Sequence, residues 1–347
     1  MQQLTQHIRR VPSRAAAPAI LLFFLAPALA ELFSGSAPPV EYFAPPALLL
    51  LHCAYGATAV LMREWAIRRG LNAWGRLVLA LTMGIYIEGV LCKSFFSPQW
   101  PDFSFPAGYG RVLDVNWHWT VMLMLFHAVA SFLIPWLIVD LLLPRFKNTP
   151  ALNIPWTVVL AIASLGVAVL GFTTFPMNTA GEIYHPAWLH ALLAWGVLML
   201  LPWLAAKVPE PARSSRIALS PRLLGVLMFC AWLLFMLMSW AGVEQFHWSA
   251  TTVVLLQLAV VAVALALAWR QRSLLTDAHR YALVLGHVWF WGILGLIQEL
   301  DNAKRSDNTA GMAIVALLVL LGVYLLGWRL RTRRRAPEPE ALSTLAQ

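Results

Sequence analysis

Long apolar runs, separated by short polar or basic stretches, dominate the pattern of the chain. Ten of them are long enough to cross a hydrocarbon core of about 30 Å as helices. These runs cover residues 16–31, 44–62, 76–96, 117–142, 154–174, 186–205, 222–243, 249–269, 281–299 and 310–328. Backbone groups find no water partners in lipid, and the ten-residue alternation of a membrane β-barrel is missing, so helices are expected. The pattern predicts an all-α, polytopic integral membrane bundle of about ten transmembrane helices.

Composition agrees with a bundle whose solvent is lipid. Of 347 residues, 60% are hydrophobic and only 12% are charged, and the mean hydropathy is +0.69. An ordinary soluble domain of this length does not have such values. We expect one transmembrane domain at residues 16–330, between a cytoplasmic N-terminus at 1–15 and a cytoplasmic tail at 331–347 that is first basic and then disordered.

The basic residues predict an orientation. With the N-terminus inside, 21 of the 25 lysines and arginines fall on the cytoplasmic side, which is the bias that cytoplasmic loops carry. The exceptions are Lys93, Arg111, Lys304 and Arg305. Both ends of the chain are therefore expected to be cytoplasmic. The formal net charge of +9 is dispersed among short loops, so it is a topology signal and no nucleic-acid partner is expected.

Each end of the chain allows two interpretations. A basic start, an apolar run and Ala28-Leu29-Ala30 also resemble a signal peptide cleaved before Glu31, which would leave nine helices and an external N-terminus. At the other end, a cluster of arginines is either a stop-transfer anchor or a binding site for anionic lipid. The members of this cluster are Arg329, Arg331, Arg333, Arg334 and Arg335.

Candidate chemistry lies where ionisable groups enter the apolar runs, because a carboxylate at the centre of a membrane helix costs roughly 2.5–3.5 kcal/mol on insertion scales. Counting 1.5 Å per residue places Glu88 and His52 about 12 Å deep, and His127 about 15 Å deep, from the outer side. Three such groups at one level could hold a divalent metal ion, form a proton relay or satisfy one another inside the bundle. Glu88 and His127 are also the candidate catalytic residues.

Other polar features extend this prediction toward the outer side. Glu182, His185 and His190 form a second group that could hold a metal ion, where a loop enters a helix. Pro135 should kink the fourth helix by releasing the carbonyl of Ser131, which lies one turn beyond His127 on the same face. The outer loops are acidic, which would favour a cation there.

Several short motifs between residues 30 and 135 resemble a widespread family of uncharacterised bacterial and archaeal multi-pass membrane proteins. They are Ala30-Glu31-Leu32-Phe33-Ser34-Gly35-Ser36 with Pro38-Pro39, Arg63-Glu64, Glu88-Gly89, Tyr109-Gly110-Arg111, Val115-Asn116-Trp117 and Phe126-His127-Ala128-Val129. This resemblance implies a multi-pass protein of the bacterial or archaeal cytoplasmic (inner) membrane, with no established activity.

Glu88 and His127 also carry a second resemblance, to the CAAX-type intramembrane metalloproteases. That family has a helix with a Glu-Glu pair and a later helix with Phe-x-x-x-His. Here Ile87 precedes Glu88, and Phe126 directly adjoins His127. The resemblance implies that Glu88 would activate water while histidines held a metal ion.

Three classes of function follow from the sequence. The first is a membrane protein with a polar cavity and a binding or transport-like site in the outer half of the membrane, around Glu88 and His127. The second is an intramembrane metal-dependent hydrolase or protease that uses the same two residues. The third is a structural or accessory subunit in which the buried polar groups serve packing alone.

Overall fold

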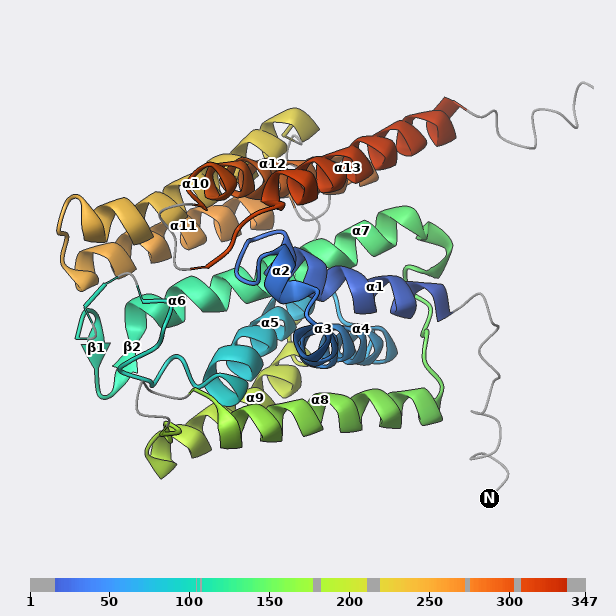
Figure 1. Ribbon diagram of the computed structural model, residues 1–347. Helices are drawn as coiled ribbons and strands as arrows, with labels where there is room; N and C mark the ends of the chain where they lie inside the picture. Colours follow the sequence, from blue (N-terminus) through green and yellow to red (C-terminus); the bar gives the residue numbers. More distant parts are fainter. Residues whose placement is uncertain are drawn as a thin grey trace, which may run out of the picture.

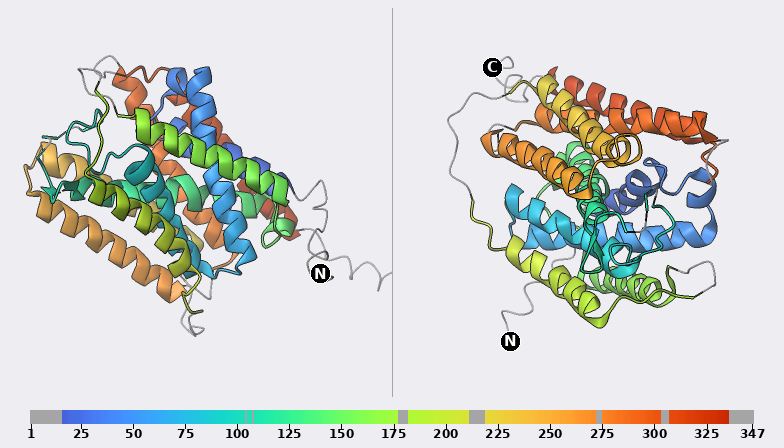
Figure 2. Two further views of the ribbon diagram at one scale, coloured as in Figure 1. Left: turned by 90° about the horizontal axis from the view of Figure 1, so that it is seen from below. Right: turned by 90° about the vertical axis from the view of Figure 1, so that its left-hand side faces the viewer.

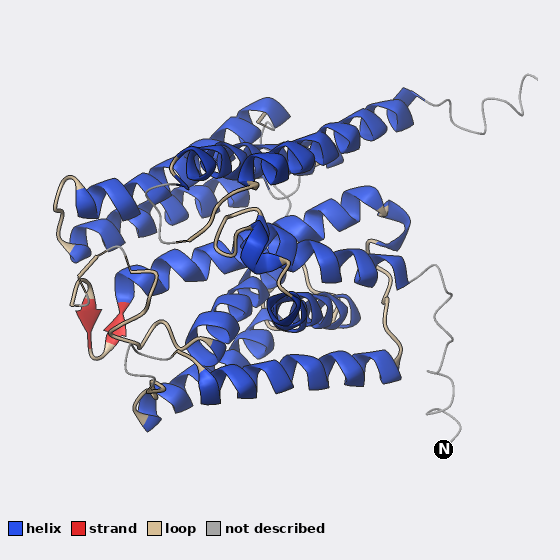
Figure 3. Ribbon diagram, viewed as in Figure 1, coloured by secondary structure: helices blue, strands red, loops and turns tan. Residues whose placement is uncertain are grey.

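The computed structural model describes residues 16–103, 105–106, 108–176, 182–210, 219–271, 275–302 and 307–335. Within these ranges the chain is almost entirely helical (Figure 3), and a short hairpin pairs β1 (Arg111–Val112) with β2 (Val115–Asn116) in antiparallel fashion. The prediction of an all-α fold is confirmed. Residues 1–15 and 336–347, with most of the predicted cytoplasmic ends, lie outside the described residues.

Four of the predicted membrane segments are helices that change from α to π geometry along their length. The first consists of α1 (Ala17–Pro27) and η3 (Ala28–Leu32). The others are α3 (Pro45–Leu51), η4 (His52–Ala57) and α4 (Thr58–Arg68); α5 (Ala73–Gly84) and η5 (Ile85–Leu91); and α6 (Trp117–Phe126), η6 (His127–Leu133) and α7 (Ile134–Leu142). We call these four segments the inner helices.

The remaining elements are regular helices and short turns. They are α2 (Pro39–Tyr42), the 3₁₀ turn η7 (Pro144–Phe146), α8 (Ile154–Thr174), α9 (Trp188–Ala205), α10 (Pro221–Glu244), α11 (Ala250–Gln271), α12 (Asp277–Leu300) and α13 (Met312–Arg335). Nine helices in the described part of the chain are long and apolar enough to cross a membrane, and the segment Ala17–Leu32 is a shorter apolar helix. These ten segments match the ten apolar runs of the sequence.

The helices form three groups in space. The helix α6–η6–α7 runs through the middle, α10 to α13 lie on one side of it, and α8 and α9 lie on the other (Figure 1). The right-hand view in Figure 2 shows the same separation, with the blue and cyan inner helices between the two outer groups. We call α10 to α13 the C-terminal group. It joins the centre through contacts of α12 with α7 and of α11 with α6.

Several helices begin at a polar residue that caps the first free backbone N–H groups. The side chains of Asn72, Asn116, Asn153 and Ser220 each accept a hydrogen bond from a backbone N–H three residues later. Proline follows in the first turn of α8 and α10, where its missing N–H costs nothing. These local signals explain why the apolar runs begin where they do.

Two close contacts hold the layers together by different means. On α4, the Glu64 carboxylate accepts hydrogen bonds from the backbone N–H groups of Ala151 (2.7 Å) and Leu152 (3.3 Å), just before α8. Between α10 and α12 the contact is apolar, because a Cβ at Gly286 would lie 2.2 Å from the carbonyl oxygen of Gly225. Small residues of this kind allow membrane helices to approach closely.

Candidate intramembrane polar site

Each of the four π-helical segments carries a buried polar side chain. Glu31 lies on η3, Tyr55 on η4, Glu88 on η5, and His127 and Ser131 on η6. We call these five residues the polar site. A π-helical turn contains one residue more than an α-helical turn, and such turns are rare and often found at functional sites. The four π-helical segments lie on four different helices, and their buried polar side chains make the polar site the candidate functional site of the fold.

The centre of the polar site is a contact between a carboxylate and an imidazole. Nε2 of His127 lies 2.7 Å from Oε1 of Glu88, and Nδ1 of the same ring lies 3.0 Å from Oγ of Ser131. The residues are 6% (Glu88), 2% (His127) and 0% (Ser131) exposed. Because all three groups are almost closed to their surroundings, the hydrogen bonds among them replace those that water would supply.

The second carboxylate oxygen of Glu88 is also satisfied. Oγ of Ser94 donates a short hydrogen bond to Oε2 of Glu88. The indole Nε1 of Trp119 donates in turn to Oγ of Ser94, at 3.0 Å. Hydrogen bonds from neutral donors stabilise a carboxylate in a medium of low dielectric constant. Glu88 is therefore held in one orientation by His127 on η6 and by Ser94, just after η5.

A second carboxylate lies next to this pair. The hydroxyl of Tyr55 donates a hydrogen bond to Glu31, and the charge of Glu31 acts on both Glu88 and His127. The ring centroids of Tyr55 and His127 are 5.7 Å apart. Tyr55 thus interacts with Glu31 through its hydroxyl and with His127 through its ring.

Acidic groups outside the spanning helices lie within electrostatic range of the polar site. Burial raises the pKa of Asp102, and the charges of Glu88 and Asp307 raise it further. Burial also raises the pKa of Glu41, with additional effects of Asp307 and Asp102. Since carboxylates that share a region raise one another's pKa, a cation or a proton is favoured there.

The structure brings together two of the three groups that the sequence placed at one depth. His52 lies apart from the Glu88–His127 contact: its Nδ1 is 2.7 Å from the carbonyl oxygen of Leu48, and its ring packs against the rings of Phe23 and Phe24. In the described part of the chain, no three histidine, cysteine, aspartate or glutamate side chains are arranged to hold a metal ion. The described residues therefore do not make the ligand set that the sequence suggested.

The second predicted group is spread over a loop and a helix start. Glu182 and His185 line a small pocket of about 290 Å³. Nε2 of His190 lies 2.9 Å from the carbonyl oxygen of Leu113, and its ring packs against Phe96. His190 therefore ties α9 to the hairpin.

The fourth predicted helix is irregular near Pro135, as the sequence indicated, but the irregularity is a π-helical segment. The sequence predicted a proline kink that would free the carbonyl of Ser131. In the structure, η6 ends at Leu133 and α7 begins at the next residue, Ile134, with Pro135 in its first turn. A π-helical turn thus comes directly before the turn that lacks the proline N–H, and the Ser131 hydroxyl on it contacts His127.

Fold and site together define a multi-pass membrane protein of α-helices with a buried polar centre. Residues 20–343 match the model of an uncharacterized membrane protein family, and the chain belongs to that family. No curated protein and no solved structure matches it. As a member of a membrane protein family, the chain lies in a lipid bilayer. None of these comparisons supports a protease activity.

Proposed function

We propose that this protein binds a proton at the Glu88–His127 pair and uses it in a binding or transport-like step in the outer half of the membrane. The observation that carries the proposal is the 2.7 Å contact between Nε2 of His127 and Oε1 of Glu88, within a region that excludes water. Ionisable groups within membrane segments are costly, and they commonly mark proton relays and ion pathways.

A proton on this pair would be shared with its neighbours. Glu31 acts electrostatically on both members of the pair, and the hydroxyl of Tyr55 links Glu31 to the space beside the imidazole. Because these groups lie close together in a medium of low dielectric constant, a change of charge at one of them would act on the others. The acidic residues Glu41 and Asp102 on the same side favour the approach of a cation or proton.

Infrared titration of the protein in lipid nanodiscs tests this proposal. The wild-type protein should show a carboxyl band that appears as the pH falls, and Glu88→Gln should remove that band and alter the titration of Glu31. Glu244→Gln is the matched control, because Glu244 lies exposed at the end of α10. Identical titrations of the buried carboxyl band in Glu88→Gln and Glu244→Gln would refute a proton site at Glu88.

One contact favours a second candidate function, an intramembrane hydrolase. The His127 ring contacts the Ser131 hydroxyl through Nδ1 and the Glu88 carboxylate through Nε2. A hydroxyl, an imidazole and a carboxylate connected in this order can activate a serine nucleophile. In that chemistry, Oγ of Ser131 attacks a carbonyl carbon while His127 accepts the hydroxyl proton and Glu88 stabilises the imidazolium. The bond to the leaving group then breaks as His127 returns the proton to it, and water hydrolyses the acyl-serine. This route uses residues that are in contact in the structure and does not require a metal ion.

Labelling with a fluorophosphonate probe distinguishes the hydrolase from the proton site. An activated Ser131 should become labelled in membranes, and Ser131→Ala should abolish the label. Ser239→Ala is the control, since Ser239 is also buried but its hydroxyl donates to the backbone carbonyl of Phe235. A protein that stays unlabelled, with its infrared titration intact, would leave proton binding as the function of the pair.

The orientation in a cytoplasmic membrane forms part of the proposal. The basic ends of α4 and α13, and the basic residues Arg145 and Lys147 that follow α7, would face the cytoplasm. The arginines of α13 would contact anionic lipid headgroups there. A cysteine at Leu113, which is 83% exposed on the hairpin, should react with an impermeant maleimide in intact cells. A cysteine at exposed Ala206, after α9, should react only after lysis. The reverse pattern would refute this orientation.

A further inference from the structure

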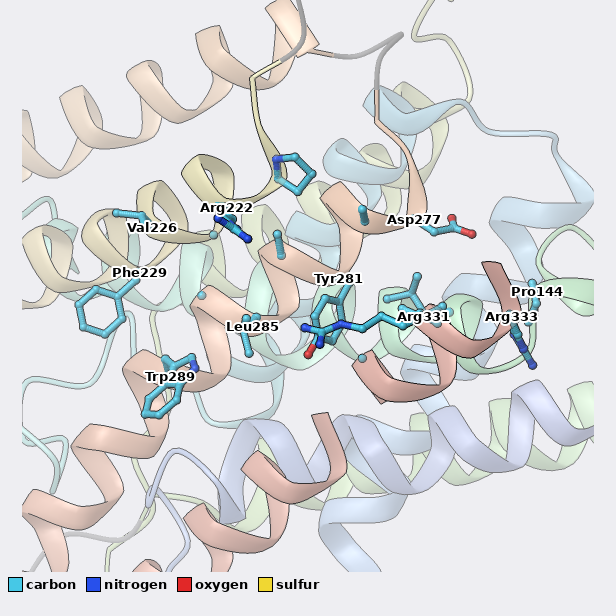
Figure 4. A pocket seen from close by; sticks show the side chains of 18 of the residues that line it. Pro144, Arg222, Val226, Phe229, Asp277, Tyr281, Leu285, Trp289, Arg331 and Arg333 are labelled. Atoms are coloured by element: carbon cyan, nitrogen blue, oxygen red, sulfur yellow. The ribbon is translucent and has the colours of Figure 1, made fainter. Parts of the chain in front are cut away.

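The C-terminal group contains a long apolar groove that the polar site does not use. Its volume is about 900 Å³, which is within the range of small-molecule sites. α12 forms its floor, and the first half of α10 and the end of α13 form its walls (Figure 4). The end of α7 contributes Leu141 and Pro144. The groove therefore begins at the basic end of the bundle.

Its floor follows one face of α12. Ala282, Leu285, Trp289 and Ile293 recur at helical spacing, and Phe229 on α10 lies opposite them. From Asp277 to Ile293 is 16 residues, or about 24 Å along the helix axis. This length passes from the end of the helix to well within an apolar core of about 30 Å. An alkyl chain fits such a surface, because apart from its basic end the groove is lined by apolar side chains.

The basic end of the groove has an excess of positive charge. Arg222 on α10, and Arg331 and Arg333 on α13, all line it (Figure 4). The hydroxyl of Tyr281, which also lines the groove, donates a hydrogen bond to the carbonyl oxygen of Val323 on α13. The carboxylate there belongs to Asp277, which forms an ion pair with Arg280 at 2.8 Å. Among the described residues, none of the three groove arginines has a carboxylate partner within 4.0 Å. Arginine guanidinium groups bind phosphate oxygens in bidentate fashion.

We propose that this groove binds a single anionic phospholipid, with its phosphate at Arg222 and Arg331 and an acyl chain along Leu285, Trp289 and Ile293. The inference rests on the proposed contact of α13 with anionic lipid, and it adds a defined site to that contact. Charge complementarity selects the headgroup, and the apolar floor takes the chain. A diffuse basic surface would attract the anionic headgroup but would have no apolar surface for the acyl chain.

Native mass spectrometry of the full chain, released from micelles that contain equal amounts of phosphatidylglycerol and phosphatidylcholine with the same chains, tests the proposal. We expect one retained phosphatidylglycerol, with a preference of at least about tenfold, equivalent to 1.4 kcal/mol. The double variant Arg222→Gln/Arg331→Gln should lose this preference. Arg270→Gln is its control, because Arg270 lies exposed at the end of α11, outside the groove.

A second pair of variants tests the groove independently of charge. Val226 lines it and is 57% exposed, so Val226→Trp should fill the space and abolish retention without crowding the core. Val263→Trp is the matched control, since Val263 is 60% exposed on α11. Equal retention of both lipids would overturn the groove proposal together with the anionic contact of α13. A preference that survives Val226→Trp would overturn the groove alone.

Two further results would distinguish the lipid groove from a dimer interface and from the proton site at Glu88. If the groove were covered by a second copy of the chain, Val226→Trp would dissociate a dimer, and the lipid assignment would be wrong. Glu88→Gln should leave lipid retention unchanged, so failure of the proton site and failure of the groove give different results.

Discussion

The inner helices and the C-terminal group differ in helix geometry and in how much of each helix is buried in the bundle. In the inner helices, polar side chains are buried and α geometry gives way to π geometry at four places. In the C-terminal group, α10 to α13 are regular, and most of their surface is apolar and exposed. In the most apolar stretch of each helix, the buried share is 61% in Trp117–Leu142, against 11% in Ala250–Arg270 and 22% in Met312–Arg333; α12 is intermediate, at 50%.

The inner helices therefore hold the polar site, whereas the C-terminal group packs beside them and contributes none of its side chains. A buried polar group in a membrane requires a partner, and a π-helical turn can direct a side chain toward one at the cost of a less regular backbone. The C-terminal group has few such requirements, and its close contact depends on glycines. We therefore expect substitutions of the same kind to have different effects in the two regions.

The largest contrast should come from two buried histidines. His127→Leu leaves Glu88 and Ser131 without their partner, and removing one member of a buried pair costs about 3–5 kcal/mol. His287 on α12 is fully buried, but neither ring nitrogen has a hydrogen-bond partner in the described part of the chain. His287→Leu should therefore change stability by less than about 1 kcal/mol or increase it. Thermal unfolding in one detergent measures both.

A double variant sharpens this comparison. If the cost of His127→Leu arises from the orphaned carboxylate, Glu88→Leu/His127→Leu should recover much of the lost stability, because an apolar pair of similar volume often replaces an ion pair well. Costs that simply add would show that the two side chains do not interact.

Glu64 tests whether every buried carboxylate of the inner helices belongs to the polar site. Glu64→Ala leaves the N–H groups of Ala151 and Leu152 and the Nε–H of Arg68 without this acceptor, and should lower stability by about 2–3 kcal/mol. Glu64→Gln keeps one acceptor oxygen and should lose less. The infrared titration of Glu88 should be unchanged in both variants. A shifted titration would mean that the two carboxylates are coupled.

In the C-terminal group, the sensitive positions should be glycines. Gly286→Ala forces a Cβ against the carbonyl of Gly225, so α10 and α12 must separate, at a cost of about 1–3 kcal/mol. Gly322→Ala on α13 is the control, because nothing lies within 4 Å of its added Cβ. It should be neutral, or stabilising by up to about 1 kcal/mol. Equal thermal midpoints for the two variants would disprove close packing at Gly286.

The smallest expected effect is a pH dependence at Lys93, just beyond η5. Its Nζ donates to the carbonyl oxygens of Phe172 and Tyr184, and burial lowers the pKa of Lys93 to about 8. The unfolded chain, with a lysine pKa of about 10.4, then binds more protons above pH 8, so stability rises with pH from about 8 to 10. Lys93→Met should remove this rise. Parallel stability curves of the two proteins would contradict it.

Much of the fold could be predicted from the sequence, because apolar runs of membrane length have few alternatives to helices. The depth of Glu88 and His127 could be counted in the same way, and the two residues do lie in contact. His52 was placed at the same depth but packs against Phe23 and Phe24. Depth follows from the number of residues, whereas the direction of a side chain depends on helix packing.

The π-helical turns and their partners could not be found in this way. Each π turn shifts the phase of the residues that follow, and no local residue type marks it. Tyr55 was therefore missed, and Glu31, which the sequence indicated only as the residue after a possible cleavage site and as part of a family motif, lies on η3. The position of Glu31 at the end of an apolar run was the signal that could have indicated it.

The contact between His127 and Glu88 can be tested most directly by ¹⁵N solid-state NMR of histidine-labelled protein in lipid bilayers. The resonances of His127 are identified as those that disappear in His127→Asn. If Nε2 is hydrogen-bonded to Glu88, Glu88→Gln should shift these resonances and the pH at which they titrate, while Glu244→Gln should not. Unchanged resonances of His127 in Glu88→Gln would contradict a shared proton site and with it the proposed function.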